Sequence, residues 1–175
     1  MAAAMRESQD ANMSNLIVIG FNNEADAFEM RAALAKLQSQ YLIEMEDAVV
    51  VTRDAKGKVQ LHQAMNLTAA GAASGGFWGM LIGMLFLNPL AGFAIGAGSG
   101  ALSGKLADIG INDPFMKELG ATLTEGTSAL FVLVRKSTPD KVLEALKPFA
   151  GKGRVLQTSL TKDKDEELRA FMEGK

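Results

Sequence analysis

Few residues in this chain have the types and the spacing that catalysis requires. His62 is the only histidine, and a histidine that acts as a general base needs a nucleophile beside it and a carboxylate to orient it. The sequence supplies neither near His62, so we interpret it as a solvent-facing histidine at the end of a strand. The chain has no cysteine, which excludes thiolate nucleophiles, disulfides and cysteine-ligated metals. The sequence therefore predicts no catalytic residue and a protein that is not an enzyme.

Two other groups of residues resemble ligand sites only at first sight. Glu44, Glu46 and Asp47 are close in sequence but lack the spaced loop that a cation site needs, so we interpret them as a solvated strand end. The glycine-rich residues 92–98 lack the Lys-Ser/Thr pair of a phosphate-binding loop. A dinucleotide-binding turn would require a strand before it, whereas these glycines continue at helical spacing. The sequence predicts no metal ion and no cofactor.

Glycine is the residue type whose spacing is most informative. Two runs recur at every fourth position, with Asn88 and Pro89 between them. Positions four apart lie on one face of a helix, and each glycine in an exposed helix costs about 1 kcal/mol relative to alanine. The pattern therefore favours close packing of helix backbones, as in small-residue interfaces of membrane helices. We predict a glycine-zipper hairpin whose packing and oligomerisation residues are Gly71, Gly75, Gly79, Gly83, Gly92, Gly96, Gly100 and Gly104.

The predicted hairpin has the composition of a membrane insertion. No Asp, Glu, Lys or Arg occurs from Val59 to Gly104, and the arm Leu67–Leu87 is long enough to cross about 30 Å of hydrocarbon. Basic residues precede the hairpin within residues 53–58 and follow it at Lys105, which by the positive-inside rule predicts a bacterial inner-membrane protein with both termini cytoplasmic. The alternative is a cytoplasmic protein whose two helices are buried in an assembly or against a sheet, because a helix that is apolar all round also suits a protein core.

The overall composition adds two expectations about partners. A net charge of −2 and the lack of a basic stripe give no reason to expect nucleic acid. A hairpin this apolar would aggregate if it were left bare, so we expect a homo-oligomer under either interpretation and membrane lipid as a partner under the first. The sequence does not identify a small-molecule ligand.

Short apolar runs flank the hairpin and predict the elements that must position it. Strands are expected at residues 16–21, 44–52, 58–62, 128–135 and 151–158, and helices at 24–40, 113–120, 138–146 and 162–175. Without residues 56–125 the order is strand, helix, strand, strand, helix, strand. That order predicts an α+β fold, a ferredoxin-like split βαβ antiparallel sheet with an inserted glycine-zipper α-helical hairpin.

The predicted organisation has five parts. They are a disordered leader (1–13), the first half of the ferredoxin-like domain (14–62), the glycine-zipper hairpin (63–107), the second half of that domain (108–160) and a charged C-terminal helix (161–175). The attachment of the last helix is left open by its sequence.

The pattern as a whole resembles a bacterial family of predicted membrane proteins known as domain of unknown function 1269. The resemblance spans about residues 14–160 and rests on five features: LIVIGF, the helix with an acidic first turn after it, EDAVVVTRDAKGKVQLHQ, the doubled glycine run and GINDPFMKELGATLTEGTSALFVLV. It implies a ferredoxin-like soluble part, a glycine-rich helical hairpin and no assigned activity. It transfers no catalytic residue to this chain.

Three functional hypotheses follow from the sequence. The first is a non-enzymatic, homo-oligomeric, membrane-associated protein that assembles through the glycine-zipper hairpin. The second is a soluble, oligomeric ligand- or protein-binding sensor module with a buried hairpin. The third is a membrane pore, which is disfavoured because the hairpin contains no ionisable side chain to line an ion path.

Overall fold

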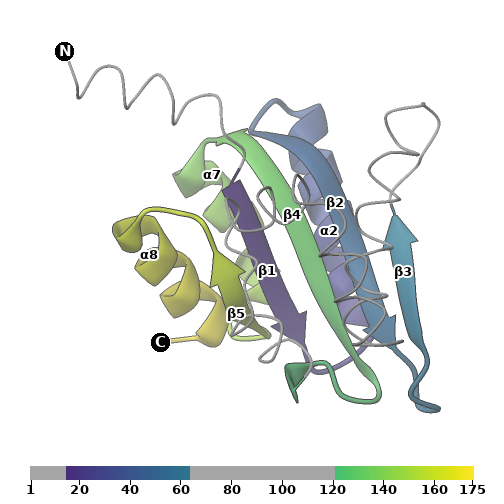
Figure 1. Ribbon diagram of the computed structural model, residues 1–175. Coiled ribbons are helices and arrows are strands. Elements are labelled where there is room, and N and C mark those ends of the chain that lie inside the picture. The colour runs from purple at the N-terminus through teal and green to yellow at the C-terminus, as the bar shows by residue number, and fades with distance from the viewer. Residues whose placement is uncertain (1–14, 64–120) are drawn as a thin grey trace, which may run out of the picture.

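The structure, a computed structural model, describes residues 15–63 and 121–175. They form a sheet of order β3-β2-β4-β1-β5 in which each pair of neighbours is antiparallel (Figure 1). The strands are β1 (Asn15–Phe21), β2 (Ile43–Arg53), β3 (Val59–Gln63), β4 (Thr127–Ser137) and β5 (Gly153–Thr158). The helices are α2 (Ala25–Ser39), α7 (Pro139–Ala145) and α8 (Lys162–Glu173), with a 3-10 turn at Lys147–Phe149. The predicted combination of helices with an antiparallel sheet is confirmed.

Several predictions concern residues outside this description. These are the leader 1–13, the helix at 113–120 and all eight zipper glycines. The hairpin predicted for 63–107 also lies outside it, apart from Gln63 at the end of β3.

The three helices pack their apolar residues against one face of the sheet. Helix α2 lies behind β2 and β4 in Figure 1, and α8 lies beside β5. On this face Ile19 of β1 pairs with Leu130 of β4, which pairs with Val50 of β2. All three are buried in one core with Met30 and Leu34 of α2. The apolar positions of residues 24–40 thus form the buried stripe that their helical spacing predicts.

Both ends of α2 are set by local hydrogen bonds. At the start, the Asn23 side-chain oxygen accepts from the Asp26 backbone N–H at 2.8 Å, which satisfies one of the unpaired donors of the first turn. At the end, the Leu42 N–H donates to the Leu37 carbonyl and the Tyr41 N–H to the Gln38 carbonyl, both at 3.1 Å. This is a Schellman motif, and it places Tyr41 at φ 61°, a position that usually holds glycine.

The β2–β3 hairpin forms where its turn residues predict it. The Asp54 carboxylate accepts from the backbone N–H groups of Lys56 and Lys58, both at 2.9 Å. Gly57 has φ +80°, a conformation that residues with a side chain rarely adopt. The turn therefore needs both the acidic residue and the glycine.

The structure resolves how the charged C-terminal helix attaches. Met172 of α8 is fully buried in the core with Val155 of β5. The helix approaches β5 at Gly153, where an added Cβ would lie 2.8 Å from the Met172 methyl carbon and 2.9 Å from Ile19 Cγ2. Only glycine fits this contact, so α8 is an integral part of the core.

Candidate functional site

A cavity of about 680 Å³ opens on the helix-bearing face of the sheet, between α7 and α8. Ligand pockets in proteins have volumes of about 300–1,000 Å³. The cavity exists because α7 spans only seven residues before the chain enters the 3-10 turn, so that α7 covers little of β1 and β4. Ile17 of β1 is consequently only half-buried at a position where the sheet is otherwise covered.

The inside of the cavity is apolar. Its floor is formed by strand residues, and its walls by α2, α7 and α8. The apolar lining consists of Ile17, Ile19, Met30, Leu34, Ile43, Val132, Val134, Pro139, Val142, Leu143, Leu146, Leu160 and Leu168. Such a surface favours the hydrocarbon part of a ligand.

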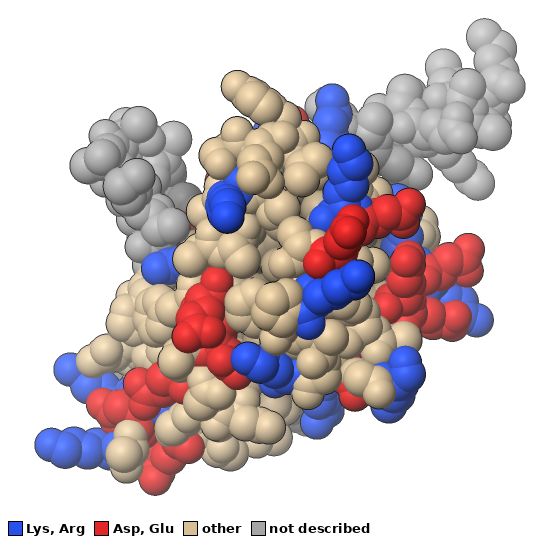
Figure 2. Space-filling view, turned by 180° about the vertical axis from the view of Figure 1, so that it is seen from behind, with Lys and Arg blue, Asp and Glu red and all other residues tan. Residues whose placement is uncertain are grey.

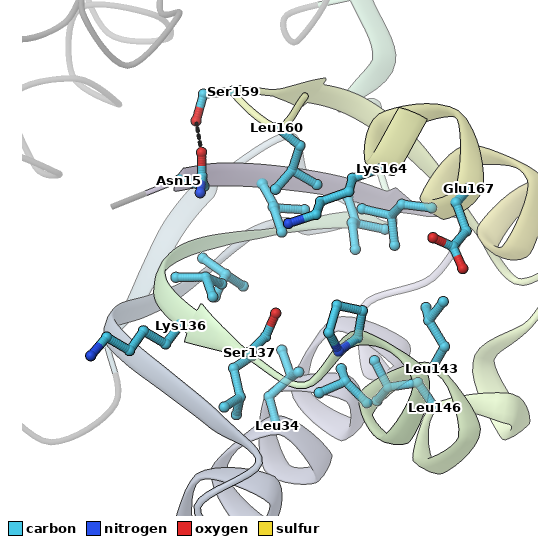
Figure 3. Close-up of a pocket in the computed structure, with 18 of the residues that line it drawn as sticks. Asn15, Leu34, Lys136, Ser137, Leu143, Leu146, Ser159, Leu160, Lys164 and Glu167 are labelled. Atoms are coloured by element: carbon cyan, nitrogen blue, oxygen red, sulfur yellow. Dashed lines mark hydrogen bonds between the residues drawn. The ribbon is translucent and has the colours of Figure 1, made fainter. Parts of the chain in front are cut away.

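The polar side chains gather at the mouth. In Figure 3 the Ser137 hydroxyl points toward the open space, while the ammonium of Lys164 and the carboxylate of Glu167 extend from α8 in different directions. Ser159 and Asn15 close the upper edge, where the Ser159 hydroxyl donates to the Asn15 side-chain oxygen at 3.3 Å. The Ser159 hydroxyl also accepts from the Leu16 N–H at 2.9 Å, which holds this edge to β1.

The charges at the mouth differ in how they are paired. Arg135 forms salt bridges to Glu44, at 3.2 Å, and to Glu46, and the hydrogen bond to Glu46 raises the pKa of Arg135. Lys136 and Lys164 form no salt bridge within the part of the chain that the structure describes. They are the lysines that line the cavity. In Figure 3 the Lys164 ammonium extends over the open space while the Lys136 side chain points away from it, so an anionic group at the mouth would meet the Lys164 ammonium.

The helix-bearing surface around the cavity carries both signs of charge. Figure 2 shows this face with Lys and Arg side chains interspersed among Asp and Glu. Charges of both signs over α2, α7 and α8 produce a mixed field, so binding here depends on the local mouth residues.

His62 occupies a half-buried position, which corrects the solvent-facing orientation expected from the sequence. Its Nε2 lies 2.9 Å from the Thr52 hydroxyl, and its ring meets the Phe28 ring edge-on with centroids 4.9 Å apart. Arg31 of α2 donates to the His62 carbonyl at 2.7 Å and stacks over Phe28. The reason for the correction is that α2 reaches over β2 to the β3 edge. This cluster joins β3 to α2, which is a structural role.

The His62 cluster predicts a specific dependence of stability on pH. Burial first, and then the charge of Arg31, lower the pKa of His62 below its ordinary 6.5, against a smaller opposite effect of Glu24. Below pH 6.5 the unfolded chain therefore binds more protons at this site than the folded chain does. The free energy of unfolding consequently decreases as the pH is lowered. We expect His62→Gln to remove the part of the pH dependence of the unfolding free energy that His62 causes.

Urea unfolding of both proteins from pH 8 to pH 5 measures this effect. At pH 8, where the imidazole is neutral, the two proteins should differ only by the Thr52 hydrogen bond and ring packing, about 1 kcal/mol. Parallel pH profiles of the two proteins would contradict the prediction.

Glu44 and Glu46 near the start of β2 form the Arg135 ion pairs described above, and the Asp47 carboxylate accepts from the Ala48 N–H at 2.8 Å. No group of three or more potential metal ligands occurs in residues 15–63 and 121–175. The cavity itself was missed by sequence reasoning. Its lining comes from β1, α2, β2, β4, α7, α8 and the loop after β5, and no local spacing in the sequence signals that these residues converge.

Comparison with known proteins supplies the family. The model of the family described as "Protein of unknown function (DUF1269)" matches residues 72–173, more than half of the chain. The chain belongs to the DUF1269 family. No curated protein and no solved structure matches it.

The DUF1269 match includes β4, α7, β5 and α8 and thus the α7 and α8 walls of the cavity. Strand β1, helix α2 and Ile43 of β2, which also contribute to the lining, precede the matched range. The family description assigns no activity, so the function of this DUF1269 protein has to be argued from its geometry.

Neither residues 15–63 nor residues 121–175 contain a helix with the length and hydropathy needed to span a bilayer. The segment predicted to insert lies outside these ranges.

Proposed function

We propose that this protein is a non-enzymatic binding module whose cavity holds a small amphipathic carboxylate, with its hydrocarbon chain inside and its head group at the mouth. The observation that carries the proposal is the cavity of about 680 Å³, with an apolar interior and a polar, lysine-bearing mouth. This is the ligand-binding alternative among the hypotheses from the sequence, now with a defined site.

The apolar lining supplies the affinity and the mouth supplies the orientation. Each buried CH₂ group contributes about 0.8 kcal/mol, so two further carbons tighten Kd by about tenfold as long as the cavity has room. Lys164 and Lys136 are exposed, and an exposed ion pair contributes about 0.2–1 kcal/mol. The chain length should therefore dominate the affinity, and the charge should select the head group.

Titration calorimetry of the full chain with octanoate and decanoate tests this function. We expect Kd to fall about tenfold from octanoate to decanoate. Leu143→Trp, which fills the cavity from α7, should abolish binding. Lys164→Gln should weaken carboxylate binding about threefold and leave decanol binding unchanged.

The matched control is Lys162→Gln, a lysine on the same helix that pairs with Glu166 at 3.8 Å and does not line the cavity. An affinity independent of chain length, or unaffected by Leu143→Trp, would refute the proposed site. Tighter binding of decylamine than of decanoate would assign the head group to Glu167 instead.

The finer fold assignment is also a proposal. We propose that the domain is ferredoxin-like, with a βαββαβ order formed by β1, α2, β2, β4, α7 and β5. The sheet order β2-β4-β1-β5 with antiparallel neighbours supports it, as does the packing of α2 and α7 on one face. In this assignment β3 is an added edge strand and α8 an added helix.

The membrane-associated homo-oligomer remains a second proposal. It is supported by the glycine spacing and by the uncharged stretch from Val59 to Gly104. It predicts contact between this stretch and lipid, which a photo-cross-linking probe placed within residues 64–104 would detect.

A further inference from the structure

The sheet has a second apolar face, opposite the helices. Side chains that alternate with the helix-facing ones point to this side, and they come from β2, β4, β1 and the edge strand β5. The second face comprises Leu16, Val18, Gly20, Val49, Val51, Ala129, Phe131 and Leu156. It lies away from the cavity, and the proposed ligand does not use it.

Strand register places these side chains in rows across the sheet. Phe131 of β4 pairs with Val18 of β1 on one side and with Val49 of β2 on the other. In the next row, Ala129 of β4 pairs with Gly20 and Val51. The space above Gly20 in the second row is filled by the Leu156 side chain, which would lie 3.3 Å from an added Cβ.

These side chains are fully covered. Val18, Val49, Val51 and Phe131 each expose 0% of their surface, and Leu156 exposes 2%. The apolar residues of α2, α7 and α8 pack with the opposite set of strand residues, including Ile19, Val50 and Leu130. The cover of the second face therefore does not come from those helices.

We infer that the second face is the docking surface of the chain's own residues 64–120. The chain leaves the described sheet at Gln63 of β3, which pairs with Val49. It returns through Leu123, 2% exposed, whose carbonyl accepts from the Arg53 guanidinium at 3.2 Å. Both junctions lie at the side of the sheet where β2 is found, so the intervening segment starts and ends beside the second face.

The composition of the segment fits this surface. The buried centre of the second face is apolar, and Asp47, Arg53 and Arg154 lie on the same side of the sheet around it. Such a centre requires an apolar partner, and residues 64–104 contain no Asp, Glu, Lys or Arg. The glycines and alanines of the segment allow close approach of a backbone to a sheet, as they do between helices. The same apolar side chains cannot face the sheet and lipid at once, so docking here competes with bilayer insertion.

Site-specific photo-cross-linking of the full chain in living cells tests the inference. Phe131 is replaced by benzoylphenylalanine, and the products are mapped by mass spectrometry after irradiation. We expect the major product to be an internal cross-link from position 131 to a peptide within residues 64–120. The matched control carries the same probe at Phe21, which faces the helices and should cross-link to α8, because Phe21 and Met172 both approach Gly153.

Tagged and untagged chains expressed together identify the source of each product. Cross-links from position 131 to a second copy, or to lipid, would overturn the inference. So would a lack of product at 131 when the Phe21 probe reacts. If the bulky probe prevents folding, Val18→Cys is combined in turn with Ser74→Cys, Ser99→Cys or Ser103→Cys, since the natural chain has no cysteine. An intramolecular disulfide with any of the three supports docking, and its absence from all three overturns it.

Discussion

Replacing Phe131 by alanine should lower the free energy of unfolding by about 3–5 kcal/mol, the largest effect that we expect from a single substitution in this protein. Phe131 exposes none of its surface and lies between Val18 and Val49 in the centre of the second face. The alanine removes the buried ring and leaves a cavity that the paired strands cannot close. Because small domains are stable by only about 5–15 kcal/mol, the loss is a large part of the total.

Urea unfolding of the wild-type and variant full chains measures the Phe131 effect. Phe131→Leu is the matched control, since it keeps an apolar side chain of intermediate size and should cost clearly less than alanine. A loss below about 1 kcal/mol for Phe131→Ala would mean that nothing packs on the second face, because the cavity penalty requires a surrounding core. That result would also argue against docking of residues 64–120.

Replacing Met172 by alanine should cost about 2–5 kcal/mol and release α8 from the sheet. Met172 is fully buried and is the only residue of α8 that is. Leu168 and Phe171 pack against the core only partly buried. The polar attachments are the Arg169 hydrogen bond to the Val155 carbonyl at 2.7 Å and the Thr158 hydroxyl donating to Asp165 at 3.0 Å. These groups are partly exposed, so they cannot hold the helix alone.

Amide hydrogen exchange separates local release of α8 from global unfolding. Met172→Ala should lose protection first in residues 162–173, while β1 and β4 exchange later. Met172→Leu preserves volume and should cost less than about 1.5 kcal/mol. Unchanged protection of α8 in the alanine variant would contradict the assignment of Met172 as its anchor. Since Lys164 is carried by α8, the alanine variant should also bind decanoate more weakly.

Local chemistry explains the elements that could be predicted from the sequence. The Thr138-Pro139 start of α7 was predicted because proline suits the first helical turn, and the structure begins α7 at Pro139. The β2–β3 hairpin was predicted from its acidic and glycine turn residues, and it forms around Asp54 and Gly57. In each case the determining contacts lie within about four residues, so the local sequence contains the information.

Contacts between distant residues explain what the sequence did not reveal. His62 was expected to face solvent, yet α2 brings Phe28 and Arg31 over it from more than thirty positions earlier. The buried anchor of α8 depends on Gly153, whose missing side chain admits Met172. Neither contact has a periodicity that a local reading can detect.

The family, the antiparallel sheet with its helices and most element positions could be predicted from the sequence, because hydrophobic alternation, turn residues and caps act over short distances. Tertiary structure alone decided where the cavity lies. Its residues converge only once β1 and β4 are paired and α7, too short to cover them, leaves space beside α8. The tertiary structure also gives both faces of the sheet a buried apolar centre. Strand pairing between distant segments aligns Val18, Phe131 and Val49 in one row. Such convergence depends on long-range packing, which no short stretch of the chain encodes.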